Sequence, residues 1–209
     1  MLESIARGAM LATAHLLTGV RAVWAAEPPA GPCVYFGNHV SHGDFALIWA
    51  VLPALERART RPVAGADYWE KGWLRRYIGR RVVRAVLIER ERDKRTSDPI
   101  AQMASVLAAG ESLILFPEGT RNQGDALLLP FKSGLYHLGR AHPGLPLVPA
   151  WIDNLHRVLP KGEVIPVPLL CTVHFGAPIQ VGAEESKEDF LARASAALLA
   201  QRPAHLEAP

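Results

Sequence analysis

The sequence predicts an α/β fold with a mostly parallel central sheet that is flanked by helices. Short apolar runs that suit buried strands alternate along the chain with longer segments of helical pattern, as in parallel sheets that are covered on both faces. The chain has 209 residues, of which 49% are hydrophobic and 21% charged, and this is enough to bury the core of one domain. No internal repeat or low-complexity linker divides the sequence.

The first expected element is an amphipathic helix over residues 1–26. It should end at the proline-rich segment 27–32, because proline cannot continue a helix. Arg7 and Arg21 bracket thirteen residues, fewer than the roughly 20 that cross a bilayer. One helical face would carry Glu3, Arg7, Ala14, Thr18 and Arg21, and the other Leu2, Ile5, Ala9, Leu16, Val20 and Val23. Such a helix lies in a membrane interface or packs on the core of its own protein.

The remaining elements follow from apolar runs and from the residues that interrupt them. Apolar runs predict strands at 33–38, 61–66, 81–89, 111–119, 145–152 and 169–179. Helical patterns predict helices at 43–57, with Pro53 near the end, and at 67–79, 97–110, 131–142 and 186–202. The helix at 97–110 has the clearest signals, with Ser97 or Asp98 as N-cap, Pro99 at the first position and Gly110 after the end.

The charge of the chain is concentrated in one block. The net charge is +3, and the segment from Arg75 to Arg95 holds eight arginines and one lysine. Such a block suits phosphate on nucleic acid, on anionic lipid or on a small substrate, or it is a solvated basic face. A nucleic-acid binder is disfavoured, because the sequence is expected to lack interleaved exposed aromatic residues and has no recognisable binding module. Cys33 and Cys171 make no disulfide framework, and no Cys/His cluster suggests zinc.

The segment "GNHVSHGD" at 37–44 follows an expected strand, which is where sites form in α/β sheets. His39 and Asp44 are five residues apart and would not share a face of one regular helix. With His39 in the loop and Asp44 in the first helical turn, the carboxylate can hold one imidazole nitrogen and leave the other as a general base. His39 and His42 could be two ligands of a metal ion, but a metal site would need a third ligand at a suitable spacing. No G-x-S-x-G motif is present, so a base at His39 would act on a substrate hydroxyl.

A second polar segment, "FPEGTRN" at 116–122, follows another expected strand. Pro117 and Gly119 predict a turn, whose backbone amides could form an anion cradle together with Arg121. Arg90 ends the preceding strand in a similar way, so two arginines could hold one phosphate. Two alternatives stay open: Arg90 could pair with the glutamates of "ERER", and Glu118 could accept backbone amides.

These segments resemble the motifs of the glycerolipid acyltransferases, in the lysophosphatidate acyltransferase group. The first motif of that family, N-H-x-S-x-x-D, is similar at Asn38, His39, Ser41 and Asp44. The third motif is similar at Phe116, Pro117, Glu118, Gly119, Thr120 and Arg121, and the segment after it at Phe131, Lys132 and Gly134. The fourth is similar at Val148, Pro149 and Ala150, and Arg90 stands for the arginine of the second. The likeness spans about residues 32–180.

The resemblance implies that residues 27–209 form an acyltransferase domain. The domain would transfer a fatty acyl group from an acyl-carrier protein or coenzyme A thioester to the hydroxyl of a lysophospholipid. With 1-acyl-glycerol 3-phosphate as acceptor, the product is phosphatidic acid. His39 would be the general base and Asp44 would orient it. Substrate binding is implied for Asn38, Ser41, Arg90, Glu118, Gly119, Thr120, Arg121, Lys132 and Pro149.

The resemblance also bears on partners and location. It implies no metal, no resident cofactor beside the thioester co-substrate, no covalent acyl-enzyme and no nucleic-acid partner. The enzyme would be peripheral or monotopic on the cytoplasmic face of the inner membrane, docked through residues 1–26. Alternative acceptors are glycerol 3-phosphate and a lyso-ornithine lipid. A lipid-binding membrane protein without activity is the alternative from another class, and the intact pair His39 and Asp44 argues against it.

Overall fold

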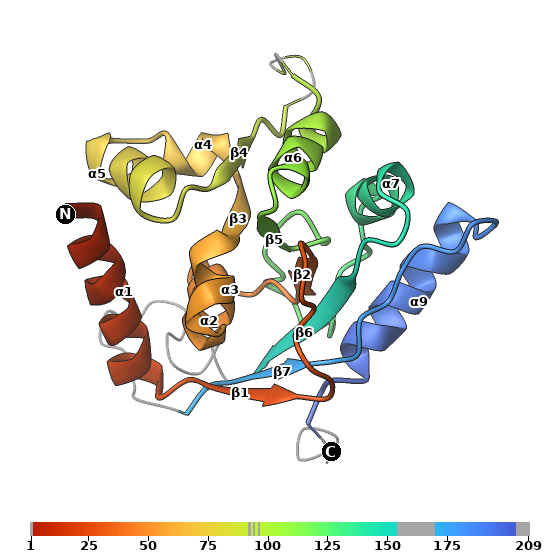
Figure 1. Cartoon of the computed structure of the whole chain (residues 1–209), viewed down its shortest axis with the longest axis horizontal. Helices are drawn as coiled ribbons and strands as arrows, with labels where there is room; N and C mark the ends of the chain where they lie inside the picture. The colour runs from red at the N-terminus through yellow and green to blue at the C-terminus, as the bar shows by residue number, and fades with distance from the viewer. Residues whose placement is uncertain (1, 92, 94, 96, 154–169, 204–209) are drawn as a thin grey trace.

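A seven-stranded sheet separates two layers of helices in the computed structural model, which describes residues 2–91, 93, 95, 97–153 and 170–203 (Figure 1). The strands are β1 (Arg21–Trp24), β2 (Val34–Gly37), β3 (Thr60–Gly65), β4 (Val86–Ile88), β5 (Ser112–Leu115), β6 (Leu147–Asp153) and β7 (Thr172–Phe175). Their order across the sheet is β1-β7-β6-β2-β5-β3-β4. Among the described strands all neighbours are parallel except β6 and β7. The predicted mostly parallel α/β sheet is therefore confirmed.

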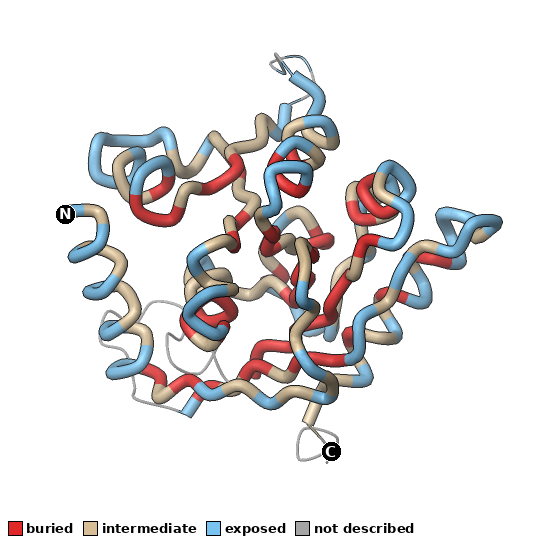
Figure 2. Tube along the Cα trace, in the orientation of Figure 1, coloured by how far each residue is buried: buried red, intermediate tan, exposed pale blue. Residues whose placement is uncertain are grey.

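Each face of the sheet has its own hydrophobic cluster. On one face lie α1 (Leu2–Thr18), α2 (Asp44–Val51) and α3 (Ala54–Arg59), and on the other α6 (Pro99–Ala108), α7 (Gly134–Ala141) and α9 (Lys187–Leu199) (Figure 1). Ile48 and Phe175 are fully buried in the first cluster, and Leu135 and Phe190 in the second. Figure 2 shows the buried residues gathered along the sheet and on the inner sides of the helices. The alternation of strands and helices thus gives the two covered faces that the sequence predicts.

A small helical layer lies beyond the end of β3 and leads into β4. It consists of α4 (Ala66–Trp69), α5 (Trp73–Tyr77) and the π-helical turn η1 (Ile78–Val82). The single helix predicted at 67–79 is wrong in this respect, because Gly72 adopts a left-handed conformation with φ 86° and separates α4 from α5. The strand predicted at 81–89 is shortened to β4, because η1 and the turn after it take its first residues.

The structure corrects the extent of the first helix. The helix ends at Thr18 and not at residue 26, because Gly19 turns the chain with φ 51° and residues 21–24 form β1. This strand pairs with β7, and Arg21 lies opposite Thr172. Residues 21–24 therefore belong to the central sheet and not to an N-terminal helical appendage.

Other predicted boundaries shift by less. The helix predicted at 43–57 divides at Pro53 into α2 and α3. The strand predicted at 169–179 is the shorter β7, and Leu169 lies outside the described residues. The helix predicted at 97–110 is α6, which begins with Pro99 and is capped by the side chain of Asp98 accepting the N–H of Ile100 at 3.0 Å.

The orientation of α1 differs from the predicted one. Arg7, which was expected on the solvent-facing polar side, donates to the carbonyl of Val82 at 2.6 Å. Met10, Leu11 and Ala14 pack against the buried core, while the opposite side exposes 72% of Leu2, 61% of Ile5 and 81% of Leu16. The helix therefore packs on the protein and also presents apolar side chains outward. Among the described residues no helix is long and apolar enough to cross a membrane.

Parallel strands bring the predicted polar segments to one edge of the sheet. His39 follows β2, Phe116 follows β5 and Arg90 follows β4. Since β2, β5, β3 and β4 are successive neighbours and all parallel, their carboxyl ends face the same way. A site at this edge is the arrangement expected for an open α/β sheet.

Candidate active site

A histidine–aspartate pair lies at the carboxyl end of β2. Nδ1 of His39 lies 2.7 Å from Oδ2 of Asp44, and the histidine side chain is 14% exposed while the aspartate is fully buried. A carboxylate accepts hydrogen bonds, so Nδ1 carries the proton and Nε2 is the basic atom of the ring. The ring stacks on Phe116, with 4.4 Å between the ring centroids. The predicted pair is therefore formed. Asp44 orients the His39 ring through a hydrogen bond to Nδ1, and Phe116 orients it by stacking on its face.

Asp44 also organises the loop that carries the histidine. Its Oδ2 accepts the backbone N–H groups of Val40 at 2.7 Å and Ser41 at 2.9 Å. Burial raises the pKa of the Asp44 carboxyl, while the hydrogen bonds from His39 and from these two N–H groups oppose that shift. The Asp44 carboxylate thus holds the loop in place through two backbone hydrogen bonds and fixes the tautomer of His39 through a third.

Glu118 joins this loop to the one after β5. Its Oε1 accepts the N–H of His39 at 2.8 Å, and its Oε2 accepts the N–H of Leu129 at 2.8 Å. Burial raises the pKa of Glu118, and the two backbone N–H groups oppose the shift. On the other side, the N–H of Asn122 donates to the carbonyl of His39 at 2.6 Å. Glu118 is 2% exposed, so its carboxylate holds protein segments together and is not presented to a ligand.

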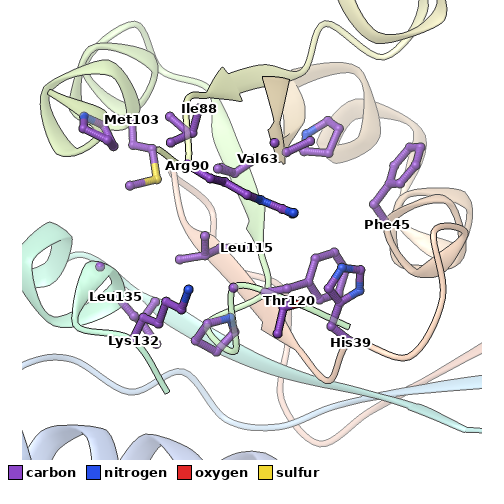
Figure 3. Close-up of a pocket in the computed structure, with 18 of the residues that line it drawn as sticks. His39, Phe45, Val63, Ile88, Arg90, Met103, Leu115, Thr120, Lys132 and Leu135 are labelled. Atoms are coloured by element: carbon purple, nitrogen blue, oxygen red, sulfur yellow. The ribbon is translucent and has the colours of Figure 1, made fainter. Parts of the chain in front are cut away.

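His39 opens into a pocket of about 910 Å³ between the two loops and the elements β3, β4, α4, α6 and α7. One part of the lining is apolar and is formed by Pro62, Val63, Ile88, Ile100, Met103, Leu115 and Leu135. In Figure 3, Ile88 and Met103 lie on the side of the pocket away from His39. The pocket can therefore take an amphiphile whose apolar chain lies toward α6 and whose reacting group lies at the histidine.

The polar part of the pocket is cationic. Cationic side chains reach it from separate segments, namely Arg90, Arg95, Arg121 and Lys132. Gly119 is required here, because it has φ 70° and an added Cβ would lie 2.7 Å from the Lys132 side chain. Guanidinium and ammonium groups that converge on one cavity favour an anionic ligand, and phosphate matches the arginine fork best.

Arg90 has an ion-pair partner outside the glutamates of "ERER", namely Asp67. It lies next to the end of β3, where a Cβ on Gly65 would come within 2.6 Å of its Nε. Its guanidinium forms an ion pair with Asp67 at 3.7 Å and is about half exposed. Asp67 therefore holds Arg90 over the pocket, and a half-exposed pair of this kind leaves the guanidinium available to a ligand.

The predicted site residues divide into two groups. His39, Arg90, Gly119, Thr120, Arg121 and Lys132 line the pocket, and Asp44 lies directly behind His39. Four residues expected to bind substrate are not among the described residues that line the pocket, namely Asn38, Ser41, Glu118 and Pro149. Each of the four is engaged with the protein in this structure, and a direct contact with substrate stays a prediction for them.

The contacts that engage these four residues with the protein differ. Asn38 is buried and bonds both the N–H and the carbonyl of Ile152, which ties the end of β2 to β6. The hydroxyl of Ser41 accepts the N–H of Gly43 at 3.2 Å inside the loop. Pro149 is a buried residue of β6 and lies opposite Phe36 of β2. Glu118 bridges the two loops, which was the alternative left open for it.

Sequence reasoning missed several residues of the pocket. His42 stacks on Tyr68 of α4, with 4.1 Å between the ring centroids. Burial lowers the pKa of His42, and the positive charge of Arg121 lowers it further, so the ring is held neutral. Arg95 lies in the basic block, yet nothing local in the sequence distinguishes it from the other arginines there. No group of three or more metal-ligating side chains occurs in the part of the chain that the structure describes.

Known proteins share both the sequence pattern and the fold. A family model described as Acyltransferase matches residues 20–153. A human 1-acyl-sn-glycerol-3-phosphate acyltransferase alpha is 33% identical over 146 residues, which make up 65% of this chain and 46% of that protein. A 1-acyl-sn-glycerol-3-phosphate acyltransferase from Haemophilus influenzae is 28% identical over 131 residues, or 59% of this chain and 49% of that protein. The chain spans about half the length of these curated relatives.

A solved structure extends the likeness to nearly the whole fold. The crystal structure of PlsC, a 1-acyl-sn-glycerophosphate acyltransferase from Thermotoga maritima, matches with a TM-score of 0.68 and 20% sequence identity. The match covers 99% of this chain and 83% of that one. At 20% identity this likeness shows the fold alone. The family model covers most of the site, from the loop of His39 to the end of β6. The chain belongs to the acyltransferase family.

Proposed function

We propose that the protein transfers a fatty acyl group from an acyl thioester to the free hydroxyl of 1-acyl-glycerol 3-phosphate, which gives phosphatidic acid. The observation that carries this proposal is the pocket itself. It combines a histidine with a free basic nitrogen, a cluster of cations and an apolar branch. The named activities of the relatives from human and Haemophilus influenzae support the same acceptor.

In the proposed reaction, Nε2 of His39 takes the proton of the acceptor hydroxyl as its oxygen attacks the thioester carbonyl. A carbon–oxygen bond forms, and the tetrahedral oxyanion collapses by breaking the carbon–sulfur bond. The thiolate then receives the proton from the imidazolium, so His39 returns to its starting state. Asp44 stabilises the imidazolium through the Nδ1 hydrogen bond. General-base assistance of this kind contributes a factor of about 10²–10⁴.

The acceptor phosphate is proposed to lie among Arg90, Arg95, Arg121 and Lys132. Their convergence on the pocket supports a dianionic head group more than an uncharged one. Glycerol 3-phosphate would use the same cations but would leave the apolar branch to the acyl donor alone. A lyso-ornithine lipid carries a carboxylate together with an ammonium group, so this cluster would attract its zwitterionic head group less than a phosphate dianion.

The developing oxyanion needs donors that are not already used. Backbone N–H groups of both loops are engaged, because that of His39 donates to Glu118, those of Val40 and Ser41 to Asp44, and that of Gly119 to the carbonyl of Phe116. These bonds disfavour the amide of Gly119, one of the backbone amides of the turn at 116–122, as an oxyanion donor. Thr120 and Arg121 line the pocket beside these amides, and we propose that they supply the oxyanion donors.

The membrane location is also a proposal. The outward side of α1 carries exposed Leu2, Ile5 and Leu16, and we propose that it docks on the cytoplasmic face of the inner membrane without crossing it. Docking would place the protein where a lysophospholipid acceptor resides. The acyl donor, an acyl-carrier protein or coenzyme A thioester, would arrive from the aqueous side.

The decisive experiment incubates the purified protein with 1-acyl-glycerol 3-phosphate and each of the two thioester donors, and detects phosphatidic acid by mass spectrometry. Parallel reactions contain glycerol 3-phosphate or a lyso-ornithine lipid as acceptor. Product from 1-acyl-glycerol 3-phosphate that depends on His39 supports the proposal. Lipid binding without product from any acceptor would favour the inactive lipid-binding alternative.

A further inference from the structure

Two large apolar side chains at the start of α5 face outward. Trp73 is 79% exposed and Leu74 is 52% exposed, and they are adjacent in the chain. We call this pair the α5 tip. Its neighbour Trp69 is packed inward, in an edge-to-face contact with Phe45 at 5.8 Å between ring centroids. Trp69 is half-buried by such contacts, whereas Trp73 is almost fully exposed, and an exposed pair of large apolar side chains indicates a surface that contacts something apolar.

The surroundings of the α5 tip are cationic. Lys71, Arg75, Arg76 and Arg80 are exposed around it, and Glu70 is the one acidic residue between positions 70 and 81. Glu70 forms an ion pair with Arg80, so the charge of the remaining cations is not balanced locally. The partner that fits this surface is anionic at its rim and apolar beneath it.

The α5 tip is connected to the mouth of the pocket. The guanidinium of Arg75 lies over the ring of Tyr68, 4.5 Å from its centroid, and the other stacking contact of Tyr68 is with His42 of the catalytic loop. Tyr68, Trp69 and His42 all line the pocket. A ligand that binds the α5 tip would therefore also restrain the pocket lining formed by Tyr68 and His42, beside the route by which an acceptor would enter.

The α5 tip lies on the same side of the molecule as α1 (Figure 1). From α5 the chain runs directly into η1, and Arg7 of α1 donates to the carbonyl of Val82 in η1 at 2.6 Å. Glu3 of α1 forms an ion pair with Arg81 of η1 at 4.0 Å. These contacts place α1 beside η1 and therefore near the α5 tip, so a membrane that reaches one lies close to the other.

We infer that the α5 tip is a second membrane anchor, which inserts Trp73 and Leu74 into a bilayer rich in anionic phospholipid and turns the mouth of the pocket toward it. Tryptophan suits the bilayer interface because its ring is apolar and its N–H is polar. The surrounding cations are attracted to anionic head groups. An interface with a second copy of this chain is the weaker fit, because it would bring the like-charged arginines and lysine of the two copies together. The benefit to catalysis rests on the proposed function, whereas the binding itself does not.

The test is co-sedimentation of the full chain with vesicles of phosphatidylcholine, with and without phosphatidylglycerol. The variant is Trp73→Ala with Leu74→Ala. Val23→Ala is the matched control, since Val23 is 49% exposed on β1, at the opposite end of the molecule from α5 (Figure 1). We expect the double variant to lose about 10- to 100-fold in affinity for the anionic vesicles, because two side chains leave the bilayer. The control should bind as the wild type does.

A second measurement keeps this inference separate from the proposed reaction. Acyl transfer to a short-chain, soluble lysophosphatidate should be unchanged in the double variant, whereas transfer to a long-chain acceptor in vesicles should fall. Lack of transfer by the wild type to either acceptor would refute the proposed reaction and leave the vesicle result standing. Equal vesicle binding by wild type and double variant would overturn the second anchor. So would a dimer in sedimentation velocity that the Trp73 and Leu74 substitutions dissociate.

Discussion

The carboxylate of Glu118 accepts the backbone N–H of His39 at 2.8 Å. The two residues lie on the loops after β5 and β2, which are neighbouring strands of the sheet. Since Glu118 is 2% exposed and its second oxygen accepts the N–H of Leu129, it fixes the position of His39 from behind. The acidic residue of this motif therefore arranges the site, and we predict that it does not contact the substrate.

The first prediction tests that role. Glu118→Gln replaces one acceptor oxygen by an NH₂ group that must face the N–H of His39 or of Leu129. Two buried donors that face each other without an acceptor lower the free energy of unfolding by about 1–3 kcal/mol. The variant should therefore have a lower Tm together with a lower kcat. Gln123→Glu, at an exposed position of the same loop, is the control and should change neither. A normal Tm with a KM raised only for the acceptor would mean that Glu118 reaches the substrate.

His39→Ala should abolish acyl transfer and leave the fold intact. Asp44→Asn should lower kcat strongly, by up to about 10²–10⁴-fold, with little change in lysolipid binding. The cause differs between the two variants, since one removes the base and the other its orientation and charge. Single-turnover kinetics and circular dichroism measure both effects. Near-normal turnover by His39→Ala would show that another group is the base.

The buried charge of Asp44 predicts a dependence of stability on pH. Burial raises the pKa of this carboxyl in the folded protein. The folded state therefore binds the proton more tightly than the unfolded state, and the stabilisation is present below the unfolded pKa and lost as the pH rises through the folded pKa. The ionised wild type carries a desolvated charge that Asp44→Asn lacks.

Asp44→Asn should accordingly have a higher Tm than the wild type at neutral pH. The difference should shrink as the pH falls toward the folded pKa, where the wild type is protonated. Thermal denaturation across this range measures it. The control Asp125→Asn, at an exposed position, should show no such trend. A lower Tm for Asp44→Asn at neutral pH would mean that its hydrogen bonds outweigh the cost of burying the charge.

The cationic part of the pocket predicts a selective effect on the acceptor. Arg121→Ala and Arg90→Ala should each weaken binding of the anionic acceptor about 10- to 150-fold, the effect of a charge-assisted hydrogen bond of about 1.5–3 kcal/mol. Donor binding should change less. Asp67→Asn should have a smaller effect than Arg90→Ala, because Asp67 orients Arg90 without contacting the acceptor. Steady-state KM values for both substrates decide this, with exposed Arg140→Ala as the control.

The outward side of α1 predicts vesicle binding that can be removed without unfolding. Deletion of residues 1–26 is not a clean test, because it removes β1 and the buried Thr18 and Val20. The combined change of Leu2, Ile5 and Leu16 to serine should instead keep the Tm and reduce vesicle sedimentation, since each apolar side chain contributes at most about 1.5–3 kcal/mol. Met10→Ser, on the inward side, should lower the Tm. Unchanged sedimentation of the triple variant would limit α1 to a packing role.

The sequence by itself determined the elements whose signals are local. The apolar runs at 33–38 and 145–152 form strands, and Asp98 and Pro99 begin α6 as predicted. The spacing of His39 and Asp44 allowed their hydrogen bond as a possibility, because a loop followed by a helical turn can bring residues five apart together, and the likeness to the family motif supported it. Turns, caps and short spacings depend on a few consecutive residues, so the sequence displays them directly.

Only the tertiary structure decided what depends on distant partners. β1 exists because Arg21 lies opposite Thr172, and α1 turns Arg7 inward because Val82 offers a carbonyl there. The same holds for Glu118, which is a bridge because His39 and Leu129 present their N–H groups to it, and for Arg90, which Asp67 holds over the pocket. Trp69 and Trp73 have similar local sequence surroundings, yet one packs on Phe45 and the other faces outward. Contacts between residues far apart in the chain settle these cases, because the free energy of a side chain depends on which groups the folded chain brings to it.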